Sequence, residues 1–149
     1  MIAAQAGDRE RLVILEDTVE LQCTAVNHVA LRTTDTIDLT RLLRATLRLR
    51  PDRIIVGEVR GPEALALLKA WNTGHSGGLA TVHANSAAAG LLRLEQLIQE
   101  AGVPPPPALI AEAVNVVIAV VKAGGRRFVK DVQVVKGYSP QAGYQLTPL

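Results

Sequence analysis

The 149-residue sequence has little of what stabilises small secreted proteins or stacks on nucleic-acid bases. Its single cysteine, Cys23, excludes an internal disulfide framework, and the chain does not cluster the further ligands that a structural zinc site needs. One Trp, two Tyr and one Phe are too few for the rows of rings with which most single-strand nucleic-acid binders stack. These absences predict a protein of a reducing cytosol.

Long apolar runs and a strong net charge are also missing. The longest apolar run, residues 116–121, is far shorter than the roughly 20 residues of a membrane-spanning helix. The first residues lack the basic-then-apolar order of a signal peptide. Sixteen Lys and Arg against 14 Asp and Glu leave a formal charge of +2. We therefore expect membrane association to be peripheral, and we expect no direct sequence-specific binding of nucleic acid.

The composition, 48% hydrophobic and 20% charged, provides enough apolar residues for a sizeable core. Short apolar runs alternate with longer amphipathic ones, which is typical of a mainly parallel α/β sheet. The pattern predicts strands over 12–15, 28–33, 54–56 and 79–82, and helices over 38–49, 61–74 and 86–100, with Asp38 as the N-cap of the first helix. A short helix over 108–113 follows, then an antiparallel hairpin of 114–121 and 128–135 with its turn at Ala123-Gly124-Gly125, and an edge strand within 137–149.

Polar side chains follow three of these strands directly. Glu16 and Asp17 end the first, Glu58 comes after the strand at 54–56, and His83 follows the strand at 79–82. Taken singly, each is more simply a solvated loop residue, but parallel strands end at one edge of a sheet, where ligands bind. Carboxylates at two strand ends can hold a hydrated Mg²⁺, and an imidazole can contact a phosphate, so this edge is suited to bind a phosphate ester with its Mg²⁺. The phosphate-binding pattern G-x-x-x-x-G-K-[ST] is absent from these 149 residues.

Three ordered segments, LEDTVEL, LRLRPDRIIVGEVRGPEA and NTGHSGGLATVHANS, resemble the Asp box, atypical Walker B segment and His box of the secretion ATPases of type IV secretion, conjugation and type IV pili. The residues of these segments most resemble those of the conjugative-transfer (TrbB-type) branch of the family. The resemblance extends over about residues 11–138. The resemblance implies a partial RecA-like P-loop NTPase core in one truncated domain, residues 1–149, with helices on both faces of the sheet. The P-loop strand and N-terminal domain would lie upstream, leaving the strands at 79–82 and 114–121 without their shared neighbour.

The resemblance also implies roles for the acidic residues. It places Glu16, Asp17 and Glu20 near the attacking water and Mg²⁺, and it makes Glu58 the Walker B glutamate. Asp17 and Glu58 would hold Mg²⁺ through water. Either Glu20 or Glu58 would be the general base.

The two histidines of the His-box segment, His75 and His83, would form a pair with His83 nearer the nucleotide. Their spacing of eight around a Gly-Gly turn is unlike that of zinc ligands on one element. For His75 the alternative is a solvated loop residue.

Arginines supply the candidate phosphate contacts. Arg41, Arg44 and Arg48 share one face of the predicted helix, where a solvated basic stripe is the simpler interpretation. The alternative brings Arg48 or Arg60 to a phosphate or across a subunit interface.

In the complete enzyme, the resemblance implies a hexameric ring on the cytoplasmic face of the inner membrane. It would hydrolyse ATP with Mg²⁺ to power conjugative DNA transfer or type IV secretion, in contact with channel proteins. One alternative is a non-hydrolysing fragment that acts at most as an association module. A small DNA-binding module built on the basic stretch 41–53 is a third possibility, against which the low net charge and scarce aromatics argue.

Overall fold

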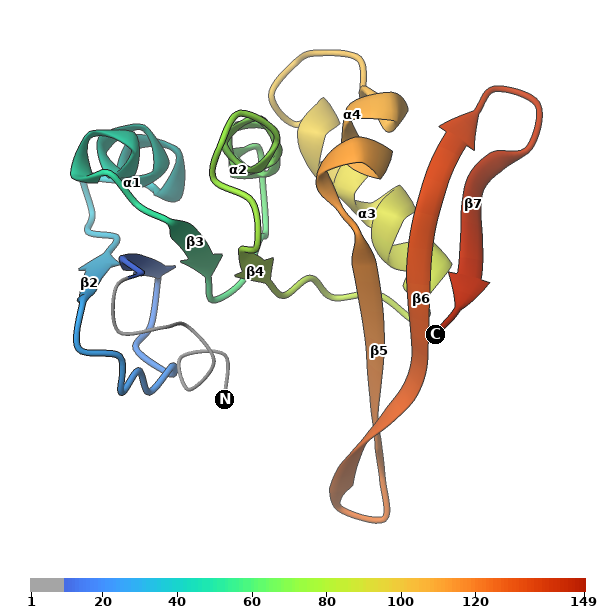
Figure 1. Cartoon of the computed structure of the whole chain (residues 1–149), viewed down its shortest axis with the longest axis horizontal. Helices are drawn as coiled ribbons and strands as arrows, with labels where there is room; N and C mark the ends of the chain where they lie inside the picture. Colours follow the sequence, from blue (N-terminus) through green and yellow to red (C-terminus); the bar gives the residue numbers. More distant parts are fainter. Residues whose placement is uncertain (1–9) are drawn as a thin grey trace. The chain divides into compact units, whose positions relative to one another are not determined.

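The computed structural model describes residues 10–149, which belong to two compact units, Met1–Thr81 and Val82–Leu149 (Figure 1). Each unit has its own sheet: four parallel strands in the order β2-β1-β3-β4 in the first, and three antiparallel strands in the order β5-β6-β7 in the second. The predicted α/β class, with a mainly parallel sheet and a C-terminal antiparallel hairpin, is confirmed. No helix within residues 10–149 is long and apolar enough to cross a membrane.

The first sheet contains β1 (Leu12–Glu16), β2 (His28–Arg32), β3 (Arg53–Val56) and β4 (Leu79–Ala80). The first three agree with the predicted strands, whereas β4 ends two residues earlier than predicted. Beyond that point the Thr81 hydroxyl donates to the Gly57 carbonyl at 2.6 Å, and the backbone N–H of Val59 donates to the Thr81 carbonyl at 2.9 Å.

All five residues of β1 are buried, because both of its faces are covered. Leu12 and Ile14 form a cluster with Ile55 of β3, and Cys23 and Ala25 from the segment after β1 pack against that cluster. In this position Cys23 acts as a small apolar side chain that fills space beside the cluster. Val13 and Leu15 point to the opposite face because side chains alternate along a strand.

Two helices complete the first unit. Helix α1 (Leu39–Thr46) contacts β1 and β2, lies beside α2 (Glu63–Asn72), and continues into the 3₁₀ turn η2 (Leu47–Leu49). Asp38 is its N-cap, as predicted, and the carboxylate of Asp38 accepts a hydrogen bond from the backbone N–H of Arg41 at 2.7 Å.

The second unit contains α3 (Ala87–Gln99), α4 (Pro107–Ala113), β5 (Val116–Ala123), β6 (Arg126–Ser139) and β7 (Gly143–Pro148). The predicted turn at Gly124 and Gly125 is confirmed, with φ values of 55° and 78° that suit glycine in a two-residue hairpin. Strand β6 is longer than predicted because it pairs with β5 along its first part and with β7 along its second.

Strands β4 and β5 belong to different sheets, and each is the last strand of its sheet. Within residues 10–149, no strand lies between them in a common sheet. That a strand of the complete enzyme lies between them stays a prediction.

Candidate functional site

The loops after β1 and β3 leave the first sheet side by side at its carboxyl edge. Leu15 pairs with Val56, and the backbone N–H of Gly57 donates to the Leu15 carbonyl at 2.8 Å. Asp17 and Glu58, two residues beyond that pair, therefore emerge at the same edge, as the sequence predicts. His83 lies in the second unit, so its approach to Glu58 stays a prediction.

Arg60 links the two acidic loops. Its Nη2 donates to Oε2 of Glu58 at 2.6 Å, and its Nη1 lies 3.7 Å from Oδ2 of Asp17. The hydrogen bond with Glu58 raises the pKa of the Arg60 guanidinium above its ordinary value. Asp17 also accepts a hydrogen bond from the Thr33 hydroxyl at 2.9 Å. The loops after β1, β2 and β3 thus meet around a pair of carboxylates that the exposed Arg60 bridges.

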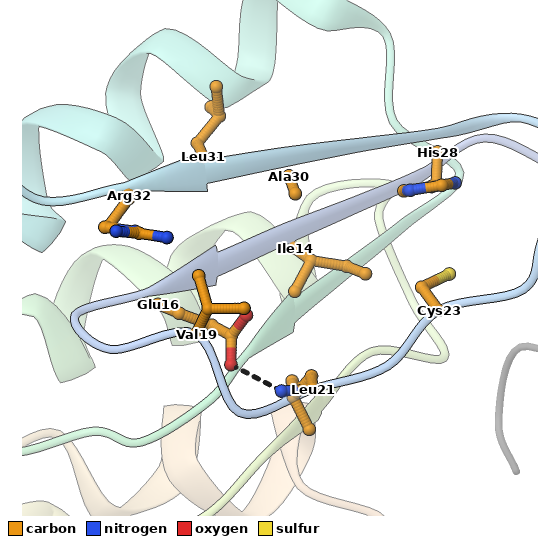
Figure 2. Close-up of a pocket in the computed structure, with 9 residues that line it drawn as sticks. All are labelled: Ile14, Glu16, Val19, Leu21, Cys23, His28, Ala30, Leu31 and Arg32. Carbon is orange, nitrogen blue, oxygen red and sulfur yellow. Dashed lines mark hydrogen bonds between the residues drawn. The ribbon is translucent and has the colours of Figure 1, made fainter.

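Glu16 is the last residue of β1, and its approach to the attacking water and Mg²⁺ stays a prediction. Glu16 is only 5% exposed, and Oε1 accepts hydrogen bonds from the backbone N–H groups of Glu20 and Leu21, each at 2.9 Å. Figure 2 shows the bond to Leu21. A Cβ at Gly57 would lie 3.1 Å from Cγ of Glu16, so the neighbouring strand leaves room for this carboxylate. Glu16 therefore shapes the loop that carries Asp17 and Glu20.

Glu63 has an equivalent position in the second acidic loop and was not among the predicted site residues. It is 7% exposed, and Oε1 accepts the backbone N–H groups of Arg60 and Gly61 at 2.7 and 2.9 Å. The sequence signal, an acidic residue in the first turn of a helix, indicates only a favourable helix-dipole interaction. The structure shows that Glu63 fixes the turn between Glu58 and α2.

We expect Glu63→Ala to lower the free energy of unfolding of the first unit by about 1–3 kcal/mol, because two N–H groups lose their acceptor and Gly61 is buried. Urea unfolding followed by the fluorescence of Trp71 measures this change. Amide exchange should accelerate at Arg60 and Gly61. The exposed Asp35→Ala serves as the control and should change stability by less than about 0.5 kcal/mol. Equal effects of both substitutions would contradict the anchoring role.

Two other predicted site residues lie at the opposite, amino edge of the sheet. Nδ1 of His75 donates to the Pro51 carbonyl at 2.8 Å, and Pro51 precedes β3. Arg48 is exposed in η2, where the chain has returned to the amino edge because α1 connects the parallel strands β2 and β3. The structure does not bring Arg48 or His75 to Glu58 within the first unit, so their contacts with a nucleotide stay predictions.

A cavity of about 460 Å³ opens beside the Asp17 loop, on the face of β1 and β2 where Glu16 points (Figure 2). Its wall is largely apolar, and the loop crosses it with Glu16 as the anchoring carboxylate. The cavity therefore leaves space beneath the loop, next to the two hydrogen bonds that hold it. Its lining residues are Ile14, Glu16, Val19, Leu21, Cys23, His28, Ala30, Leu31 and Arg32.

Residues 10–149 contain no group of side chains that could coordinate a metal ion directly through three ligands. No three His, Cys, Asp or Glu side chains within residues 10–149 are grouped to hold a metal ion. Asp17 and Glu58 do fit a hydrated Mg²⁺, which keeps several waters and uses one or two carboxylates.

Comparisons with known proteins identify the family of the chain. A family model described as "Type II/IV secretion system protein" matches residues 2–134. The chain is 54% identical over 133 residues to the conjugal transfer protein TrbB of Rhizobium radiobacter, covering 89% of this chain and 41% of that protein. It is 37% identical over 148 residues to the type IV secretion system protein PtlH of Bordetella pertussis, covering 88% and 44%.

Solved structures show the same relationship. The VirB11 ATPase of the Brucella suis type IV secretion system matches with a TM-score of 0.77 and 30% identity, over 84% of this chain and 40% of that one. The chain thus spans about two fifths of the length of these relatives. The match of the family model to most of the sequence, together with these relatives, shows that the chain belongs to the type II/IV secretion system protein family.

Proposed function

We propose that this chain is the C-terminal part of an ATPase that powers conjugative DNA transfer or type IV secretion. The observation that carries the proposal is the Asp17–Arg60–Glu58 arrangement at the carboxyl edge of a parallel sheet, where nucleotides bind in open α/β folds. The conjugal transfer protein TrbB and the VirB11 ATPase support the assignment through their similarity in sequence and fold.

Hydrolysis forms a bond between a water oxygen and the γ-phosphorus of ATP and breaks the bond to the bridging oxygen, so that ADP leaves. Glu58 or Glu20 takes the proton of that water. Mg²⁺, held through water by Asp17 and Glu58, would neutralise charge on the phosphate oxygens. Arg60 is exposed enough to exchange one carboxylate for a phosphate oxygen. Glu16 and Glu63 keep the two loops in place through their backbone hydrogen bonds.

The remaining predicted site residues act from elsewhere in the assembly. We place His83 near the terminal phosphate once the upstream part of the enzyme is present. Arg48, at the amino edge, is better placed to reach a nucleotide of an adjacent subunit than the one beside Glu58. His75 would then orient the segment before β4 through its bond to Pro51.

The complete enzyme would form a hexameric ring, bind channel proteins, and sit peripherally on the cytoplasmic face of the inner membrane. The second candidate, a non-hydrolysing fragment that associates with full-length subunits, is favoured by one observation. The pattern G-x-x-x-x-G-K-[ST] does not occur in the 149 residues.

A conjugation assay tests the proposed function. We expect plasmid transfer to be restored when this chain replaces the matching segment of TrbB in a Rhizobium radiobacter strain that lacks the protein. Glu58→Gln in that chimera should reduce transfer by roughly 10²-fold or more, because Glu58 acts on the water and the metal. Glu100→Gln, an exposed acid after α3, is the matched control. Equal transfer by the Glu58→Gln and Glu100→Gln chimeras would refute the proposal.

A further inference from the structure

The end of the β5–β6 hairpin, residues 120–130, carries a dense group of cations. Figure 1 shows this hairpin end extending past α3 and α4 within the second unit. Every residue from 122 to 130 is exposed, and no acidic residue occurs between Glu112 and Asp131. The four cations are Lys122, Arg126, Arg127 and Lys130.

The placement of these cations works against the stability of the hairpin itself. Lys122 and Arg127 are directly opposite each other in the strand register, and like charges at such positions repel. The register shifts between Ala119 and Val120, so that Lys130 is an extra residue at a bulge. None of the four cations forms a salt bridge with another residue of the described range 10–149. A local arrangement that opposes folding in this way is expected where a partner compensates for it.

Apolar side chains are exposed among the cations. Val129 is 62% exposed and pairs with Val120, which is 55% exposed, on one face of the hairpin. Phe128, 50% exposed, pairs with Val121 on the other face. A nucleic-acid backbone would use the cations but would leave the valines in water. The interface of an anionic bilayer accommodates both, since cations meet the headgroups while apolar side chains reach the acyl boundary.

We propose that the hairpin end binds an anionic phospholipid surface. Lys122, Arg126, Arg127 and Lys130 contact the headgroups, and Phe128, on the bound face of the hairpin, enters the acyl boundary. This inference deepens the membrane placement proposed above and does not depend on ATP hydrolysis. The vesicle experiment and the conjugation assay can therefore fail separately.

Co-sedimentation of the 149-residue chain with vesicles tests the proposal. The chain should bind vesicles of phosphatidylglycerol and phosphatidylcholine, bind poorly to phosphatidylcholine alone, and dissociate as salt rises. Arg126→Gln/Arg127→Gln should weaken binding roughly 25-fold, at about fivefold per cation. Arg44→Gln/Lys69→Gln removes the same charge from exposed positions of α1 and α2 and should leave most of the binding intact.

Phe128→Ser separates insertion from charge attraction, because it leaves every cation in place. It should weaken binding to the phosphatidylglycerol vesicles while the salt dependence persists. Full binding by Phe128→Ser, or equal losses in the two double variants, would overturn the proposal. Tighter binding to a DNA duplex than to the anionic vesicles would overturn it as well and assign the hairpin end to nucleic acid.

Discussion

The 149-residue chain by itself is expected to hydrolyse ATP no faster than its Glu58→Gln variant. Phosphoryl transfer is catalysed mainly by positioning and charge stabilisation, and the pattern whose backbone amides and lysine bind the phosphates is absent from these residues. Arg60, the cation at the acidic edge, is already engaged by Glu58 and Asp17. A coupled phosphate-release assay compares the two proteins directly.

Fusing the upstream region of Rhizobium radiobacter TrbB to this chain should raise turnover by roughly 10²–10³-fold or more, since it would supply the missing phosphate contacts. In the fusion, Glu58→Gln should then lower turnover by about 10²–10⁴-fold. Glu100→Gln again provides the control. Rapid, Glu58-dependent hydrolysis by the unfused chain would contradict the hypothesis that these 149 residues alone are a non-hydrolysing fragment. It would also require a phosphate-binding site elsewhere in the 149 residues.

Gly78→Ala should produce the largest loss of stability in the first unit. A Cβ at Gly78 would lie 2.1 Å from Nε1 of Trp71 and 2.3 Å from the Ile54 carbonyl oxygen. These two atoms are themselves joined by a hydrogen bond of 3.2 Å between α2 and β3. Overpacking combined with loss of this bond should destabilise the unit by about 3 kcal/mol. The thermal midpoint, followed by Trp71 fluorescence, should fall by roughly 10–20 °C.

Gly90→Ala is the matched control, because the nearest atoms to a Cβ there lie 3.8–4.0 Å away. Gly90 is inside α3, so alanine should leave the second unit unchanged or stabilise it by up to about 1 kcal/mol, as measured by circular dichroism. Trp71→Phe should not rescue Gly78→Ala, since the Ile54 carbonyl is still in the way. A normal midpoint for Gly78→Ala would show that the segment before β4 can move aside.

Features that depend on residues close together in the sequence were predictable from the sequence alone. The apolar periodicity placed the strands and helices, Asp38 and Ser86 were identified at the starts of α1 and α3, and the glycine pair marked the hairpin turn. Strands that share a direction bring their following residues to one edge, so the meeting of Asp17 and Glu58 was predictable as well. Helix capping, turn formation and apolar periodicity depend on residues a few positions apart, so a single sequence is enough to predict them.

The tertiary structure alone decided how the carboxylates are used. Glu16 and Glu63 carry the same side chain as Glu58, but their burial against backbone N–H groups makes them anchors of the loops. Arg60 lies between the loops that follow β1 and β3, where it contacts Asp17 and Glu58. His75 is hydrogen-bonded to Pro51 at the amino edge of the sheet. Two of these contacts, Arg60–Asp17 and His75–Pro51, join segments that are distant in sequence. All of them depend on which way a side chain turns once its loop is packed. The sequence determined which residues reach each end of the first sheet, and packing determined which of them face the site.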